Sequence, residues 1–284
     1  MRRAGLITVL IGLLSGGARA GEVIGPRRDV PPVSSAPMGM DAVKRGVQGP
    51  EGLVNARILL HVNASKGAFG KPVTLAPDLF YAVTDTLSLG LLHNLPMGIL
   101  TRPGSLPLGG GPGLCLTGKS GGCPKVYDNL GLDVLYGLAF GDVHFSLHGS
   151  FYVLNFSDPT LLMLTLGAAA KFHFSDDVAL FLDPQFGIAL DHREVNKDQL
   201  FLPIQLQFQL ARPTALDLLT GVTGRLSGFG DSYQIPLGLA LIYNINPHWD
   251  VGAKFAFDNL LGHQPPGVSR TDWRSLALIV NVRP

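Results

Sequence analysis

Two side chains near the middle of the chain have the types and the spacing of a nucleophile and its base. His144 and Ser146 lie two residues apart, so on an extended strand both point to the same face. A serine hydroxyl beside an imidazole could attack an ester or an amide. Asn155, a candidate third member, falls on the opposite face by the same alternation. We therefore favour two polar residues that line an interior, and keep a hydrolase using Ser146 and His144 as the weaker hypothesis.

Other signals of chemistry in the sequence are weak. There is no H-E-x-x-H motif, and we interpret the glycine-rich stretch 109–113 as loop material rather than as part of a phosphate-binding loop. The formal net charge of +1 argues against a nucleic-acid-binding surface. We expect no catalytic site, no cofactor, no metal and no nucleic-acid partner.

The amino terminus predicts export. Two arginines precede an apolar stretch, and residues 18–20 fit the small-x-small cleavage pattern, so we assign residues 1–20 to a signal peptide. The apolar stretch is too short for a spanning helix, which needs about 20 apolar residues. Residues 21–51 carry many prolines and no periodicity, and we interpret them as a flexible periplasmic leader. The alternative is that this leader folds back as a plug, for which it is short.

The two cysteines, Cys115 and Cys123, lie close together in a glycine-rich segment. In an exported protein a disulfide is the default interpretation of such a pair. A metal site would need more ligands than this loop supplies. We predict a Cys115–Cys123 disulfide that closes a ring in an outward-facing loop over residues 93–127.

From residue 52 onward the apolar residues alternate with polar ones at a period of two, which is the pattern of β-strands. In residues 200–210 every even position is apolar, while the odd positions include Gln205, Gln207 and Gln209. The apolar face is about 10 residues long, the length of a tilted transmembrane strand. The same pattern predicts strands near 53–63, 71–83, 86–93, 128–140, 143–156, 160–174, 178–190, 199–210, 214–226, 232–244, 249–261 and 272–283.

The connections between these strands alternate in character. Short polar turns near residues 84–85, 141–142, 175–177, 211–214 and 246–248 alternate with connections that are mostly longer or richer in Gly and Pro. In bacterial outer-membrane barrels the short turns are periplasmic and the long loops extracellular. An even number of strands then leaves both termini in the periplasm. Aromatic residues recur on the outer face near the predicted periplasmic end, as expected at a membrane interface: Tyr81, Phe140, Phe174, Phe208, Tyr243 and Trp249.

From residue 52 to the end, the sequence resembles the broad family of bacterial outer-membrane β-barrel proteins, although it matches no particular member. The resemblance rests on the alternation, the asymmetry of the turns and the aromatic belt. It implies an all-β fold, a closed antiparallel transmembrane β-barrel of about 12 strands over residues 52–284. It also implies outer-membrane lipid, lipopolysaccharide and the barrel assembly machinery as partners. One departure is the end, Val282-Arg283-Pro284, where such barrels usually finish on an aromatic residue.

Two other folds remain as alternatives. The mean hydropathy of +0.27 also fits a helical membrane protein, but the longest uncharged runs alternate with period two. A soluble β-sandwich or small barrel also alternates, because one face forms its core. Only 15% of the residues are charged, against about 25% in typical soluble domains, which favours a membrane barrel.

By parity, the charged residues of the strands fall on the inner face and would line the lumen. The candidates are Arg57, Asp78, Asp133, His144, His148, Lys171, Asp183, Asp217, Arg225, Lys254 and Asp258, with His61 and His173 beside them. Their signs nearly balance, so we expect little charge selectivity. A barrel of about twelve strands lies between a filled barrel and an open channel.

The first hairpin makes the most specific prediction. If Val62 opposes Val73, Arg57 falls opposite Asp78 with both side chains inward, and directly opposed Cβ atoms lie about 4.5–5.5 Å apart. We therefore predict an ion pair between Arg57 and Asp78. For the whole protein we favour a narrow channel or transport barrel for small solutes, with a structural or surface-interaction barrel and a lipid-modifying enzyme as alternatives.

Overall fold

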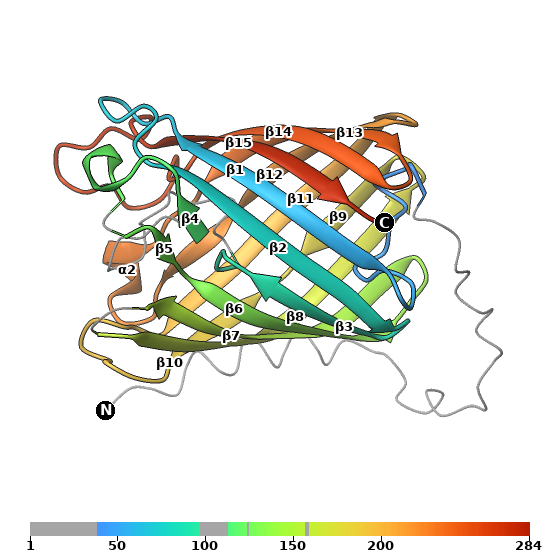
Figure 1. The fold of residues 1–284 in the computed structure, drawn as a ribbon, viewed down its shortest axis with the longest axis horizontal. Helices are drawn as coiled ribbons and strands as arrows, with labels where there is room; N and C mark the ends of the chain where they lie inside the picture. Colours follow the sequence, from blue (N-terminus) through green and yellow to red (C-terminus); the bar gives the residue numbers. More distant parts are fainter. Residues whose placement is uncertain (1–38, 97–112, 124, 157–158) are drawn as a thin grey trace. The chain divides into compact units, whose positions relative to one another are not determined.

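Twelve antiparallel wall strands close on themselves to form a barrel (Figure 1). The computed structural model describes residues 39–96, 113–123, 125–156 and 159–284. The predicted signal peptide and the first part of the leader lie outside these residues. The predicted fold class, an all-β closed antiparallel barrel of about twelve strands, is confirmed.

The wall strands follow the predicted segments closely along the chain. They are β1 (Val54–Asn63), β2 (Val73–Thr84), β3 (Leu87–Leu92), β6 (Leu130–Ala139), β7 (Val143–Asn155), β8 (Leu161–Ser175), β9 (Val178–Leu182) with β10 (Gln185–Ala189), β11 (Gln199–Ala211), β12 (Thr214–Arg225), β13 (Leu237–Asn246), β14 (Trp249–Phe257) and β15 (Arg274–Val282). The barrel closes because β1 pairs with β2 on one side and with β15 on the other, where Ala56 opposes Val282.

The two faces of the wall differ as the alternation predicts. In β6, Leu132 and Val134 are 60% and 43% exposed, whereas Asp133 between them is only 3% exposed. Apolar side chains thus face outward and polar ones face the lumen, the reverse of a soluble barrel. Most of the predicted aromatic belt lies on this outer face, where Tyr81 and Trp249 are 45% and 44% exposed.

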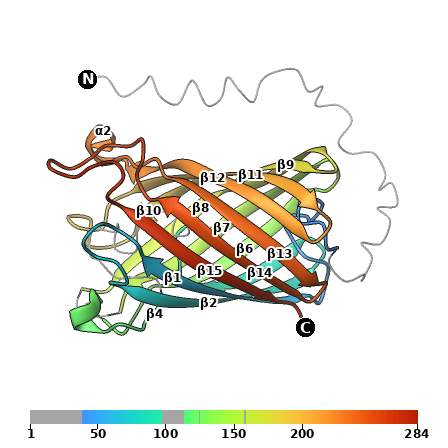
Figure 2. The ribbon, with the colours of Figure 1, turned by 90° about the horizontal axis from the view of Figure 1, so that it is seen from above.

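The two ends of the barrel carry different connections. Short turns join β2 to β3, β6 to β7, β8 to β9, β11 to β12 and β13 to β14, all at the end where the C-terminus lies (Figure 1). The longer connections lie at the other end together with β4 (Gly113–Cys115), β5 (Tyr127–Asp128) and the single-turn helix α2 (Phe229–Ser232) (Figure 2). No helix in the described part of the chain is long and apolar enough to cross a membrane.

The wall departs from the predicted strands in two places. The predicted strand 178–190 is divided into β9 and β10, because Pro184 has no N–H to continue the ladder. The backbone N–H of Asp183 instead donates to the carbonyl of Pro203 at 3.2 Å. The predicted strand 232–244 begins only at Leu237: Ser232 ends α2, and in the residues between them Gln234 makes only an isolated bridge with Thr223.

The short strand β3 pairs with only part of β2, and the sequence did not predict what covers the rest. The chain leaves the wall after Leu92, and β4 pairs with the first residues of β2, where Thr74 lies opposite Cys115. The predicted disulfide between Cys115 and Cys123 is present in this region.

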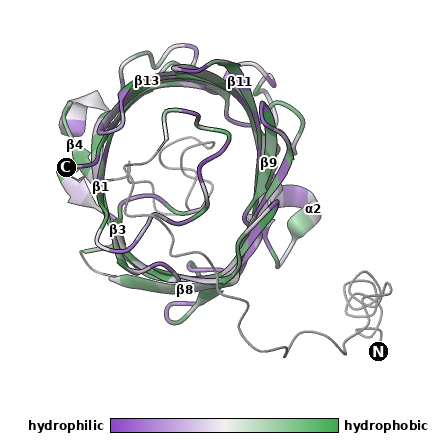
Figure 3. Ribbon diagram, turned by 90° about the vertical axis from the view of Figure 1, so that its right-hand side faces the viewer, coloured by the Kyte–Doolittle hydropathy of each residue, from purple (hydrophilic) through white to green (hydrophobic). Residues whose placement is uncertain are grey.

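Two segments of the described chain lie inside the ring of strands. Leu95, just after β3, is 7% exposed and packs with Tyr152 and Leu154 of β7. At the end with the short turns, Val43 is fully buried against the inner wall, and chain is visible inside the ring (Figure 3). The lumen is therefore partly filled from both ends.

Candidate functional site

The structure places the predicted lumen residues on the inner face of the wall. Eight of them are buried: His61, Asp78, Asp133, Lys171, Asp183, Asp217, Lys254 and Asp258. The other five, Arg57, His144, His148, His173 and Arg225, are half-buried. Because charged groups in a confined space need partners, their contacts decide what the lumen can do.

The predicted ion pair of the first hairpin is confirmed. Arg57 opposes Asp78, and Val62 opposes Val73. The Arg57 Nη2 and Nε atoms lie 2.5 Å and 3.0 Å from Asp78 Oδ2. The guanidinium also lies over the Phe80 ring, 5.2 Å from its centre, where the ring's negative face favours a cation.

Asp78 also holds the start of the inward segment. Its Oδ1 accepts from the backbone N–H of His93 at 2.9 Å and faces His93 Nδ1 at 3.2 Å. The other ring nitrogen, Nε2, lies 2.8 Å from the Tyr127 hydroxyl. Partial burial raises the pKa of this phenol, so Tyr127 remains a hydrogen-bond donor. One carboxylate thus fixes both a wall arginine and the point where the chain turns into the lumen.

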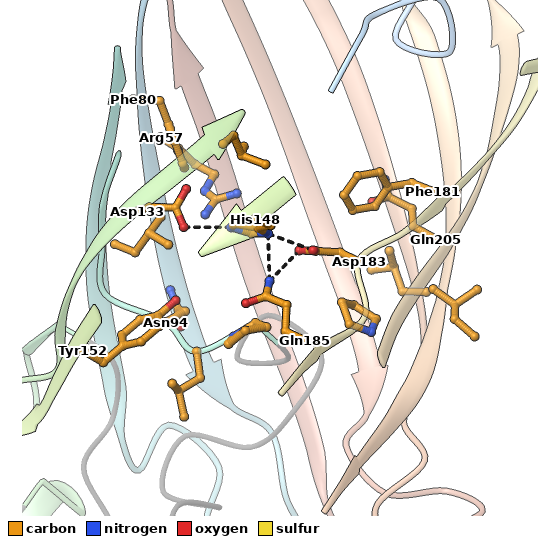
Figure 4. Close-up of a pocket in the computed structure, with 17 residues that line it drawn as sticks. Arg57, Phe80, Asn94, Asp133, His148, Tyr152, Phe181, Asp183, Gln185 and Gln205 are labelled. Carbon is orange, nitrogen blue, oxygen red and sulfur yellow. Dashed lines mark hydrogen bonds and ion pairs between the residues drawn. The ribbon is translucent and has the colours of Figure 1, made fainter. Parts of the chain in front are cut away.

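A second polar cluster is centred on His148 of β7 (Figure 4). Its Nε2 lies 2.8 Å from Asp133 Oδ1, and its Nδ1 lies 2.8 Å from Asp183 Oδ1. An imidazole that faces a carboxylate on each side can donate to both only when both nitrogens carry protons. The Ser150 hydroxyl donates to Asp133, and the Gln185 amide donates to Asp183 Oδ2 at 2.9 Å. The cluster therefore joins β6, β7 and β10, together with the break before β10, by side-chain contacts.

Beside this cluster the lumen holds a cavity of about 240 Å³, which equals the volume of roughly eight water molecules. Polar groups of both clusters line it together with the apolar faces of Phe80 and Phe181 (Figure 4). Two of the amides that line it have atoms without a hydrogen-bond partner among the described residues, namely both polar atoms of Asn94 and Oε1 of Gln185, and these atoms are buried from solvent. The cavity itself combines polar lining groups with flat apolar surfaces, which suits a small polar molecule.

Comparison with known proteins identifies the architecture. No family model and no curated protein matches the sequence. Among solved structures, the NanC porin is 6% identical, with 81% of this chain and 98% of that one covered and a TM-score of 0.53. An outer membrane channel from Pseudomonas putida F1 is 11% identical, with 84% and 97% covered and a TM-score of 0.51.

The chain has the fold of the bacterial outer-membrane β-barrel proteins. At these identities the likeness concerns the fold alone. The helical membrane protein and the soluble β-sandwich considered from the sequence are therefore wrong.

In this outer-membrane barrel, His144 and Ser146 do not form a nucleophile and its base. Within the described residues no hydrogen bond joins them; the His144 ring instead packs edge-on against Phe140 and His173, with centres 5.9 Å and 5.2 Å apart. Ser146 is 1% exposed. Nor do His148 and Ser150 form such a pair, because both bond the same oxygen of Asp133.

Two short motifs in the outer loop of the barrel escaped the sequence interpretation. Residues 113–120 fit the phosphate-loop pattern G-x-x-x-x-G-K-S, and residues 118–122 fit G-x-S-x-G. Both patterns need a strand that leads into a full helix. Here β4 leads into a single 3-10 turn, η1 (Lys119–Gly121), closed by the disulfide. The matches therefore carry no site. The described residues also contain no group of three or more His, Cys, Asp or Glu arranged to hold a metal ion.

The barrel lumen also contains an apolar layer that the sequence interpretation missed. Leu92 and Leu95 pack with inward-facing side chains of β7, β8, β11 and β12, including Met163 and Phe201. The available signal was the run Leu161–Leu164 at the start of β8, where apolar residues occupy both faces. An apolar inner face implies that something apolar packs on it, and the inward segment after β3 does so.

The remaining charges of this barrel differ in how they are satisfied. Asp217 accepts from the side chains of Gln205 and Gln207 at 2.8 Å and 3.3 Å. Asp258 accepts from the Ser275 hydroxyl at 2.6 Å. By contrast, Lys254 Nζ is buried and has no hydrogen-bond partner in the described part of the chain. Lys254 is thus a buried cation without a direct hydrogen bond, and the carboxylate of Asp258 is the opposite charge that attracts it.

Proposed function

We propose that this protein is a narrow outer-membrane channel for small, uncharged polar solutes, and that the cavity beside His148 binds the solute in transit. The observation that carries the proposal is the cavity itself, which lies within the lumen and is lined by polar side chains such as Asn94 and Gln205 together with aromatic rings. A lining of this mixed kind can bond a small polar molecule and also pack against its apolar face. The two similar structures, described as a porin and a channel, support this proposal.

The charges around the cavity favour an uncharged solute. Arg57 is already paired with Asp78, and His148 stands between two carboxylates. A charged solute would have to compete with these contacts and lose its own hydration. A polyhydroxylated or amide-bearing molecule can form hydrogen bonds with polar lining groups such as Gln205 and can place an apolar face on Phe80 or Phe181.

The same proposal includes the cellular setting. A barrel with an apolar outer face needs outer-membrane lipid, and lipopolysaccharide would contact the end that carries the long connections. We place the short turns and both termini in the periplasm, with residues 1–20 removed as a signal peptide and the barrel inserted by the assembly machinery. Export through the inner membrane delivers the termini to that side.

Liposome swelling with purified protein tests the function. Uncharged polyols and sugars of increasing size should enter wild-type liposomes up to a size limit set by the cavity. The Asn94→Leu variant should slow their entry several-fold by removing a polar side chain from the cavity lining. Gln199→Leu is the matched control, because Gln199 of β11 is an amide buried to the same degree that does not line the cavity, and its variant should behave as wild type.

A second candidate function is a structural or surface-interaction barrel without a pore. The apolar layer around Leu92 and Phe201 favours it, because it fills part of the lumen. Liposomes that contain folded protein but neither swell nor conduct ions would refute the channel and leave this alternative.

A further inference from the structure

Residues 39–51 enter the end of the barrel that carries the short turns, and their last part bonds the β2–β3 turn at the rim, where the N–H of Glu51 donates to Asp85. The sequence predicted a flexible leader over residues 21–51, but the described part of it is bound to the wall. A tight turn forms where the N–H groups of Lys44 and Arg45 donate to the carbonyls of Asp41 and Ala42 at 3.1 Å and 3.3 Å. Val43 at its tip is fully buried. The segment is seated in a specific position, as the plug alternative requires.

A clamp of charged side chains holds this turn. Arg45 Nη1 lies 2.7 Å from Asp250 Oδ2, and Nη2 lies 3.1 Å from Oδ1, which is a bidentate contact. Arg45 Nη2 also donates to Asn244 Oδ1 at 3.1 Å. On the wall side, Arg283 Nη1 lies 2.6 Å from the same Asp250 oxygen. The Asp250 side chain is 1% exposed, so the contact is shielded from solvent.

Further wall groups bind the backbone of the segment across the lumen. Lys171 of β8 donates to the carbonyls of Ala42 and Arg45 at 3.1 Å and 2.8 Å. Gln209 of β11 accepts from the N–H of Val43 at 3.2 Å, and Asn244 of β13 donates to the carbonyl of Met40. In the order of strands around the ring, β8 and β14 are nearly opposite each other. The turn therefore spans the mouth instead of lining one side.

The wall contacts of this segment are mostly polar. Only Ala42 and Val43 are buried apolar residues within residues 39–51, whereas the contacts of Arg45 and Lys171 are all charge-assisted. Such contacts can be exchanged for water without disturbing the packing of the wall. The segment can consequently leave the mouth while the barrel stays folded.

We propose that residues 39–51 form a latch that closes the mouth of the lumen, and that the Arg45–Asp250 contact keeps it shut. With the latch seated, the mouth is crossed by its backbone and the solute path is narrowed. When the contact breaks, the segment leaves and the path widens. The latch is thus an autoinhibitory element encoded in the same chain as the channel.

Neighbouring residues provide a matched test. Arg45→Gln removes the clamp. Lys44→Gln removes only an ion pair with Asp176, in which the side chains of Lys44 and Asp176 are 50% and 84% exposed. In planar bilayers, Arg45→Gln should raise the conductance or the open probability several-fold, and Lys44→Gln should match wild type. Equal conductance of Arg45→Gln and wild type, with both proteins folded by gel mobility, would overturn the latch.

A cross-link keeps the test decisive if Arg45→Gln alters assembly. A Cβ at Gly46 would lie 2.9 Å from the His144 ring, so Gly46→Cys and His144→Cys should form a disulfide that locks the segment. In the Arg45→Gln background the oxidised lock should restore wild-type conductance, and reduction should abolish that restoration. The parent protein measured with and without reductant controls for reduction of the Cys115–Cys123 disulfide.

An oxidised lock that leaves the raised conductance unchanged would refute the latch. If every variant, including one lacking residues 39–50, fails to conduct, the channel function itself is refuted.

Discussion

Two charged regions of the lumen neutralise buried carboxylates with different parts of the chain. Around His148, every partner belongs to the wall: Asp133 lies on β6, and Asp183 lies at the break between β9 and β10. At the mouth, Asp250 receives one arginine from the wall and one from the segment before β1. The first arrangement is permanent for as long as the barrel exists. The second can be undone, because one partner is carried on a removable piece of chain.

The largest expected effect is on the permanent cluster. His148→Leu leaves two carboxylates facing each other without a cation, and breaking such a buried pair costs about 3–5 kcal/mol. We expect the free energy of unfolding in detergent, followed by gel mobility in urea, to fall by about 3 kcal/mol. His173→Leu, which removes a 3.3 Å contact between Nδ1 and the Asp142 carbonyl and the edge-on ring contact with His144, should change it by less than about 1 kcal/mol. A similar loss in both variants would mean that the cluster has no special stabilising role.

A second test concerns the parity on which both regions depend. Leu206 faces outward and Gln207 faces Asp217 in the lumen. Leu206→Arg should impair insertion, because arginine near the bilayer midplane costs about 2–4 kcal/mol. Gln207→Arg should be tolerated, since it places a cation beside Asp217. Equal yields of membrane-inserted protein for the two variants would contradict the assignment of the faces.

A third test uses the cation that belongs to neither region. Lys254 has no hydrogen-bond partner in the described residues; Lys254→Met therefore removes a buried cation and its attraction to Asp258, which keeps its hydrogen bond from Ser275. Stability should stay within about 1 kcal/mol of wild type or rise. The reversal potential in a salt gradient should shift toward cation selectivity. A stability loss of several kcal/mol would show that Lys254 is paired in the functional state.

The smallest effect is expected from the disulfide. Cys115 and Cys123 are eight residues apart, and the ring that they close lies outside the wall. Replacing both with Ser should leave the unfolding midpoint of the barrel nearly unchanged while hydrogen exchange in β4 and β5 accelerates. A large drop of the midpoint would mean that this hairpin is needed to cover the edge of β2.

The sequence predicted the features that depend on local periodicity. Alternation alone located every wall strand within a few residues, and the register of one hairpin placed Arg57 opposite Asp78. It could not predict contacts between strands distant in sequence, because parity gives the face of a side chain but not its depth in the barrel. His148 and Asp183 meet only through the shear of the wall and the break at Pro184.

The positions of the two inward segments could not be predicted from the sequence for a related reason. Residues 39–51 have the composition of a free linker, and their place in the lumen is set by Asp250 and Lys171, which lie far along the chain. The apolar inner face of β8 did signal that the lumen is partly filled. It did not say by which segment.

The position of Asp250 has a consequence for the seam of the barrel, where the first and last wall strands meet. Arg45 precedes β1, Asp250 belongs to β14, and Arg283 follows β15. The two arginines therefore connect the residue stretches before β1 and after β15 to one carboxylate on β14, next to the seam between β1 and β15. Separation of β1 from β15 at this end would have to break the contact between Arg45 and Asp250 as well. The element that closes the mouth thereby also stabilises the junction between the first and last wall strands.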